Sequence, residues 1–370
     1  MNGNSNYKGF LSPLTGPEGL DFLIIGQGVC GTFLSYYLMK AGKNVVVIDN
    51  NKPFTASKVA SGVINPVTGR RIAKTWMIEK LLPFALQEYT SLGRQLGVSL
   101  VKECSVLDFH PSLQMKEAFD KRLDEEYEYL HKTEELDWKA IFDFHFGAGE
   151  ISPCLLIDIH SMLSKYRNML LNQNSLIEEI FDPQNLAVNE RNITYKNLTA
   201  NKIIFCDGVN GIDNPFFKNL PYSPNKGEAI IARIPNLDTN YIYKQGLSIV
   251  PWKDDFFWIG STYEWDFTDV LPTAAFKNKV INFLSRFLKI PFEIVDHIAS
   301  VRPANMERKP FVGLHPKFSN IGILNGMGTK GCSLAPFFSK QFSDFLVEGK
   351  PISPEADVKR FERILERRIN

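Results

Sequence analysis

The sequence predicts an α/β protein, α+β overall, with a parallel sheet in one domain and a mostly antiparallel sheet in a second. Two short apolar runs, residues 22–25 and 45–48, flank a glycine-rich turn and a segment with helical spacing, which is the order of a βαβ unit. Between residues 228 and 265, apolar and polar residues alternate with aromatic enrichment, as in antiparallel strands. A chain of 370 residues with 44% hydrophobic content can form two or three such units.

The composition disfavours several classes of protein: nucleic-acid-binding, metal-binding, disulfide-rich and membrane proteins. Lys and Arg number 42 against 41 for Asp and Glu, so the net charge creates no field that would attract nucleic acid or anionic lipid. Five scattered cysteines without a C-x-x-C pair indicate reduced thiols in a cytoplasmic protein, and the six histidines show no metal-like spacing. Residues 1–20 lack the apolar stretch of a secretory signal, and no later segment predicts membrane insertion.

The first βαβ unit surrounds the turn Gly26-Gln27-Gly28-Val29-Cys30-Gly31. After the strand at residues 22–25, the helix is predicted from the apolar positions Val29, Phe33, Leu34, Tyr37, Leu38 and Ala41. Gly42 is a plausible helix end, and the second strand, residues 45–48, is followed by Asp49. Both strands are wholly apolar, which is typical of a parallel sheet covered on both faces.

This unit has the features of a Rossmann-like dinucleotide site. Gly26 permits a tight turn, Gly28 lets the backbone approach a pyrophosphate, and Gly31 allows the helix to pack closely on the strand. The helix N-terminus attracts phosphate, and Asp49 is placed to accept hydrogen bonds from a ribose hydroxyl. A glycine-rich turn can also be purely structural, and the unit alone does not distinguish FAD from NAD.

The remaining pattern predicts alternating elements. Helical spacing occurs at residues 78–96, 114–136, 157–171 and 276–288, and in a closing helix through Phe345. Strand-like segments occur at residues 176–181, 193–195, 203–205 and 321–324. This order predicts a discontinuous nucleotide-binding domain (20–80, 150–220 and 300–370) and a second domain that contacts the substrate (81–149 and 221–299).

Four further segments resemble the D-amino acid oxidase-like family of FAD-dependent oxidoreductases, which includes glycine and sarcosine oxidases. Their order along the chain is the family's order. They are the small-residue loop 56–66, the strand end Phe205-Cys206-Asp207-Gly208, the pair Val301-Arg302-Pro303 and Lys309-Pro310-Phe311-Val312-Gly313, and the glycine-rich turn Gly326-Met327-Gly328-Thr329-Lys330-Gly331 that continues to Pro336.

The resemblance implies a noncovalent FAD. It places the cofactor against Gly26, Gly28, Val29, Gly31, Asp49, Asn50, Ser57, Ala60, Ser61, Gly62, Cys206, Gly208, Gly326, Gly328, Thr329, Lys330 and Gly331. It further implies that a substrate C–N bond is oxidised by hydride transfer to the flavin, giving an imine that water hydrolyses. Cys332 follows the lysine and is interpreted as a buried thiol without a covalent flavin link.

Three side chains are candidates for catalysis. The resemblance implies that Arg302 binds a substrate carboxylate, which a guanidinium fork matches bidentately; alternatively, Arg302 pairs with an acid or caps a carbonyl. Lys330 stabilises negative charge on the reduced flavin or is a solvated lysine, and the backbone donors of residues 328–331 could take the same role. Tyr263, with Trp252 and Trp258, lines the pocket or belongs to the core.

Three hypotheses for the substrate stay open at this stage. The first is a small amine or amino acid. The second is a modified wobble uridine in tRNA, because the last segment also resembles the FAD domain of a bifunctional tRNA-modifying enzyme; net charge does not favour this, and residues 304–308 depart from the usual Thr and Asp pattern. The third is an NAD-dependent reductase. The sequence leaves the oligomeric state undetermined.

Overall fold

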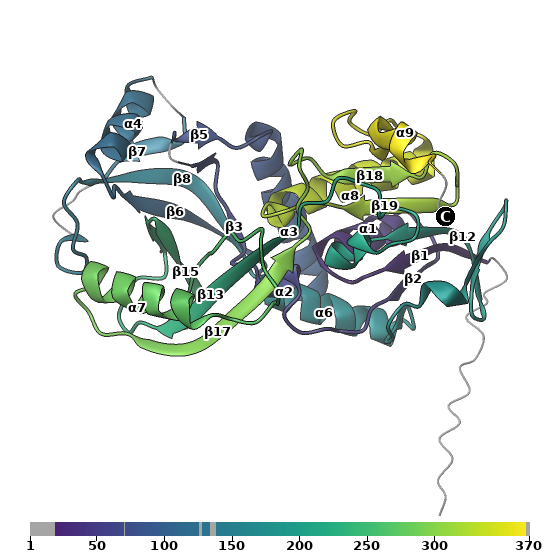
Figure 1. Ribbon diagram of the computed structural model, residues 1–370, viewed down its shortest axis with the longest axis horizontal. Coiled ribbons are helices and arrows are strands. Elements are labelled where there is room, and N and C mark those ends of the chain that lie inside the picture. The colour runs from purple at the N-terminus through teal and green to yellow at the C-terminus, as the bar shows by residue number, and fades with distance from the viewer. Residues whose placement is uncertain (1–18, 70, 126–127, 134–137, 368–370) are drawn as a thin grey trace, which may run out of the picture.

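Two lobes, each built on one large sheet, form the molecule (Figure 1). The structure, a computed structural model, describes residues 19–69, 71–125, 128–133 and 138–367. Residues 1–18, on which the expectation about targeting signals mainly depends, lie outside this part of the chain. Within it, no helix combines the length and the apolar character needed to cross a membrane.

The first lobe contains an eight-stranded sheet whose central strands run parallel in the order β9-β2-β1-β12-β19. Along β1, Phe22 and Ile24 enter one apolar core while Leu23 and Ile25 enter another, so both faces are covered as predicted. The strands are β1 (Leu20–Ile25), β2 (Val45–Ile48), β9 (Leu176–Ile177), β10 (Leu186–Val188), β11 (Ile193–Tyr195), β12 (Leu198–Phe205), β18 (Phe311–Leu314) and β19 (Ile321–Asn325).

Four helices share one apolar core with this sheet, and α1 packs directly against α8. They are α1 (Val29–Lys40), α3 (Ile78–Leu96), α6 (Ile159–Asn172) and α8 (Gly331–Glu348). Asp158 caps α6 by accepting a hydrogen bond from the Ser161 N–H, and Gly97 ends α3 in a left-handed conformation. The short α9 (Glu362–Leu365) covers the opposite face of the sheet.

The second lobe contains a nine-stranded, mostly antiparallel sheet in the order β17-β13-β16-β15-β14-β6-β8-β3, with β7 beside β8. Only the β14–β6 pair is parallel among these described strands. The strands are β3 (Val63–Ile64), β6 (Val101–Phe109), β7 (Leu130–Lys132), β8 (Ala148–Ile157), β13 (Asn225–Arg233), β14 (Tyr241–Gln245), β15 (Leu247–Lys253), β16 (Phe256–Gly260) and β17 (Glu293–Arg302).

One face of the nine-stranded sheet is closed by α7 (Ala274–Phe287), which packs its Phe276, Val280 and Leu284 side chains into a core with β13 and β16. The helix α4 (Leu113–Asp124) lies at the far end of this lobe, and the smaller elements α2 (Ala56–Val59), β4 (Val67–Thr68) and β5 (Ala73–Lys74) connect the lobes. The other face of the sheet is left to line a cavity.

Three of the predicted elements differ from the structure. The charged helix expected over 114–136 ends at Asp124, and Leu130–Lys132 forms a strand because Leu130 is buried against β8. Residues 126–127 and 134–137 of that range lie outside the described chain. The helix expected from Ile157 begins at Ile159, and the strand expected over 176–181 spans two residues.

The predicted domain boundaries depart from sheet membership in three places, one of which is residues 300–302, assigned to the nucleotide-binding domain although they end β17 of the nine-stranded sheet. Residues 150–157, assigned to the nucleotide-binding domain, belong to β8 and pair with β6 in the nine-stranded sheet, where Ile157 lies opposite Val101. Residues 63–64, assigned likewise, form β3 and pair with β8. The short apolar run at 154–157 forms the end of β8 and is followed closely by a helix. Periodicity alone does not distinguish such a short apolar strand from the start of the helix, which explains the misplaced boundary.

Candidate functional site

A cavity of about 1230 Å³ lies between the two lobes. Its volume exceeds the usual range of roughly 300–1,000 Å³ for small-molecule sites, so it has room for a large cofactor together with a substrate. The first lobe contributes the carboxyl ends of β1, β2 and β12, and the second contributes the uncovered face of its sheet. Apart from Gly31 and Gly326, every predicted cofactor-binding residue lines this cavity, as do Arg302, Lys330 and Tyr263.

The glycine-rich turn has the close contacts that its motif predicts. Gly26 has a φ of +99°, and a Cβ atom there would lie 2.5 Å from the carbonyl oxygen of Cys206. A Cβ on Gly31 would lie 1.9 Å from the Gly26 carbonyl oxygen, so α1 packs on the turn at a distance that only glycine permits. Cys206 and Gly208 follow β12 and complete this side of the cavity.

Two helix N-termini face the cavity. At the start of α1, the Val29 N–H donates to Ser57 Oγ at 3.1 Å, so the Ser57 hydroxyl lies at the helix N-terminus on the cavity wall. At the start of α8, the first-turn N–H groups of Gly331 and Cys332 have no intrahelical acceptor. Positive helix ends and unpaired N–H groups attract anions, and the donor set fits the diphosphate and ring carbonyls of FAD.

The loop after Asp49 is held against the cavity by Lys58 on α2. Its Nζ donates to the side chain and backbone oxygens of Asn51 and to the Lys52 carbonyl. Next to α2, a Cβ on Gly62 would lie 2.1 Å from the Ile157 carbonyl oxygen, which explains the small residue there. Asn50, Ala60 and Ser61 also line this part of the cavity.

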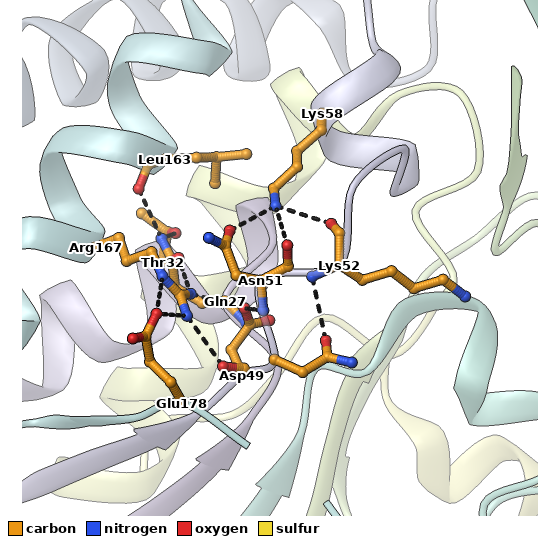
Figure 2. A network of polar contacts seen from close by, with 10 residues as sticks. Gln27, Thr32, Asp49, Asn51, Lys52, Lys58, Leu163, Arg167 and Glu178 are labelled. Carbon is orange, nitrogen blue, oxygen red and sulfur yellow. Dashed lines mark hydrogen bonds and ion pairs between the residues drawn. The ribbon is translucent and has the colours of Figure 1, made fainter. Parts of the chain in front are cut away.

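Asp49 lies in a polar network that joins four elements (Figure 2). Its carboxylate accepts the backbone N–H groups of Gln27 and Asn51 and one N–H of Arg167. Arg167, on α6, also bonds the Gln27 side chain and Glu178. Because Asp49 lines the cavity, these contacts fix the position of its carboxylate at the cavity wall.

Arg302 ends β17 and is anchored by neutral groups. Nη1 donates to Asn225 Oδ1 at 2.7 Å and to the Thr262 carbonyl at 3.1 Å, and Nη2 donates to Ser261 Oγ at 2.8 Å. The predicted carbonyl cap is therefore present, whereas no acid pairs with Arg302 among the described residues. Nε–H and one Nη2–H find no acceptor there either, which leaves two donors for a carboxylate.

The backbone below Arg302 has to be glycine. A Cβ at Gly227 would lie 2.0 Å from Nη2 of the guanidinium. Above it, the Tyr263 ring lies 4.8 Å from the guanidinium carbon. Tyr263 is more than half exposed and stacks on Trp265, so it forms part of the cavity rim. Arg302 thus lies between the Gly227 backbone and the Tyr263 ring, and it lines the cavity.

The predicted tryptophan wall is only half present. Trp258 lines the cavity, and its Nε1 donates to the Val59 carbonyl at 3.0 Å. Trp252 does not line the cavity and packs edge-on against His160. Both side chains pack against the same apolar core on the uncovered face, but Trp252 lies farther along β15 than Val250, where it contacts α6 instead of the cavity.

Gly326 is, with Gly31, one of the two predicted cofactor-binding residues that lie outside the cavity lining. It does not line the cavity; its carbonyl accepts a hydrogen bond from Asn305, and a Cβ would crowd Phe311. It serves the turn between β19 and α8. Lys330, by contrast, lines the cavity, and burial, with a smaller contribution from the charge of Arg308, lowers the pKa of its ammonium below the ordinary value.

Four residues of the cavity and its support were missed from the sequence: Gln27, Arg167, Asn225 and Lys244. Lys244 lines the cavity and pairs with the buried Asp108 at 2.7 Å. The partners of Arg167 and Arg302 lie far away in the chain, so no local spacing predicts them. Gln27 could have been identified from the sequence, because it lies inside the glycine-rich turn.

Comparison with known proteins agrees with this geometry. Glycine oxidase of Pseudomonas putida is 22% identical to the chain over 359 residues, covering 89% of this chain and 95% of that protein. The crystal structure of glycine oxidase from Geobacillus kaustophilus superposes with a TM-score of 0.76 at 19% identity, covering 95% and 99% of the two chains. Iminodiacetate oxidase from Chelativorans sp. BNC1 gives a TM-score of 0.72 at 19% identity, covering 90% and 96%.

The family match covers the cavity and both lobes. The family described as FAD dependent oxidoreductase (DAO) matches residues 21–344, from the first residues of β1 into α8. The glycine turn, the helix N-termini and the cavity supply the groups that FAD requires. The chain therefore belongs to the DAO family of FAD-dependent oxidoreductases.

Proposed function

We propose that this enzyme oxidises the C–N bond of a small amino acid or other carboxylated amine and that Arg302 binds the carboxylate. The observation that supports the proposal is that Arg302 lines the cavity and that its Nε–H and one Nη2–H have no acceptor in the described part of the chain. A planar fork with two parallel N–H groups matches a carboxylate. Similarity to glycine and iminodiacetate oxidases, whose names specify carboxylated amines, agrees with this substrate class.

The chain's own residues position the substrate. Asn225 and Ser261 hold the guanidinium in one orientation, so the bound carboxylate fixes where the neighbouring carbon lies. The apolar side chains Val250 and Trp258 line the same cavity and limit access of water to this carbon. When bound, FAD supplies the chemistry by accepting a hydride from the carbon next to the nitrogen.

The remaining steps need no side-chain nucleophile. Loss of hydride from a neutral amine leaves an iminium cation, which gives the imine by losing a proton to water, and water then cleaves the imine to a carbonyl compound and an amine or ammonia. Negative charge that develops at the cofactor is stabilised by the first-turn N–H groups of α8 and by Lys330.

Substitution of Arg302 tests the proposal. In R302M, kcat/KM for a carboxylated amine should fall roughly 10- to 150-fold, because a charge-assisted contact contributes about 1.5–3 kcal/mol. The matched control is the same amine without its carboxylate, for which wild type and R302M should have equal kcat/KM. Equal losses for both substrates, or no loss for either, would remove Arg302 from substrate binding.

A further inference from the structure

Arg167 is a buried cation beside the nucleotide half of the cavity. It projects from α6, and its side chain is 8% exposed. All five of its N–H groups have acceptors: Nε and Nη2 donate to Glu178 at 3.1 and 2.7 Å, Nη1 donates to Gln27 Oε1 and Asp49 Oδ1, and Nη2 also donates to the Asp49 carbonyl. Arg167 therefore has no donor left for a ligand.

The acceptor sites of Asp49 are nearly filled. Oδ1 accepts the Asn51 N–H and Arg167 Nη1, both at 2.8 Å, and Oδ2 accepts the Gln27 N–H at 2.9 Å. A carboxylate has about four lone-pair sites, so about one remains, on Oδ2. The Asp49 side chain is 21% exposed and lines the cavity, which leaves this site available to the ligand.

No single side chain of this network can rotate without breaking hydrogen bonds of the others. The Gln27 side chain donates to Thr32 on α1 and to the Leu163 carbonyl on α6, so it ties both helices to the turn. A rotation of Asp49 would leave the buried Arg167 without one of its acceptors, and an unpaired buried charge is costly. Figure 2 shows these side chains converging on the end of β2.

We infer that Arg167 is a positioning residue that holds Asp49 so that its carboxylate accepts a single hydroxyl of the adenosine ribose of FAD. The inference rests on the assignment of FAD to this cavity and goes beyond it. A freely rotating carboxylate could accept both the 2′- and the 3′-hydroxyl, whereas one open site on Oδ2 accepts one. The two hydroxyls therefore contribute unequally to affinity.

Equilibrium titration of the apoprotein tests this without any amine. The ligands are FAD and its two analogues that lack the adenosine 2′- or 3′-hydroxyl. For wild type, one analogue should bind roughly 10- to 100-fold more weakly than FAD, as expected for a lost hydrogen bond to a charged acceptor, and the other about equally. In R167M, FAD should bind more weakly and the difference between the analogues should shrink several-fold. K165M, on the exposed side of the same helix, should behave as wild type.

Each alternative outcome is distinct. If R167M weakens FAD and both analogues by one common factor, Arg167 only supports the fold and the inference is wrong. Equal weakening of both analogues in wild type contradicts the single hydroxyl. If R167M does not fold by circular dichroism, E178Q carries the test, because Glu178 contacts Arg167 and not Asp49; an unchanged ratio there overturns the inference. Failure of wild type to bind FAD would instead contradict the cofactor assignment.

Discussion

Asp207 is a partly buried carboxyl group that follows β12 and lines the cofactor cavity. Burial raises its pKa to about 6, although hydrogen bonds from Asn214 and Asn325 act in the opposite direction. The protonated form is therefore favoured in the folded state. The contribution of Asp207 to the free energy of unfolding is complete below its unfolded pKa of 3.8 and is lost as pH rises through its folded pKa of about 6.

The D207N variant tests this linkage. Asn carries no charge at any pH. Between pH 4 and pH 7, the unfolding free energy of wild type should therefore fall by ~2 kcal/mol relative to that of D207N, at ~1.4 kcal/mol per pKa unit with part of the change already complete at pH 4. Urea unfolding of both proteins in the same state of FAD loading measures the shift. Parallel pH profiles would show that Asp207 has an ordinary pKa.

Single residues were predictable where a motif fixes them and not where distant partners do. Gly26 and Gly31 follow from the spacing of the turn, and the clashes that a Cβ atom would make at either position explain why. Arg167 gives no such signal, since its partners Asp49 and Gln27 are 118 and 140 residues away. Arg302 was identified through family resemblance, and its anchor Asn225 became visible only in the structure.

At the scale of elements, the βαβ unit formed by β1, α1 and β2 is the part that the sequence predicted best. The runs at 22–25 and 45–48 are wholly apolar, and the glycine-rich turn follows the first of them directly, so both signals are strong. The strands β6 and β8 were not predicted, because β6 mixes exposed and buried residues and β8 begins beyond a charged segment. Their pairing with each other, over almost their full length, determines them.

The close packing inside the βαβ unit predicts the effect of G31A. An added Cβ would lie 1.9 Å from the Gly26 carbonyl, so α1 must move away from the turn. We expect a loss of about 1–3 kcal/mol in unfolding free energy, as for overpacked sites, together with weaker FAD binding. G19A is the matched control, since a Cβ there meets nothing within 4 Å. Wild-type stability and FAD affinity in G31A would contradict the packing account.

The whole molecule is organised by the cavity between its two sheets. One lobe supplies glycine backbone, helix N-termini and Asp49, and the other supplies Arg302 and an apolar wall. The sequence predicted both lobes and the discontinuous order of the chain. It did not predict that β8 and β3 join the second sheet, because membership in a sheet depends on partners that are distant along the chain.

Anaerobic mixing of the FAD-loaded protein with carboxylated amines tests the central claim most directly. Loss of the oxidised flavin absorbance reports hydride transfer without any assumption about the final electron acceptor. The account predicts rapid bleaching by at least one small amino acid or N-substituted glycine, and much slower bleaching by the same substrate in R302M. A flavin that stays oxidised with every carboxylated amine, or that bleaches equally fast in R302M, would contradict it.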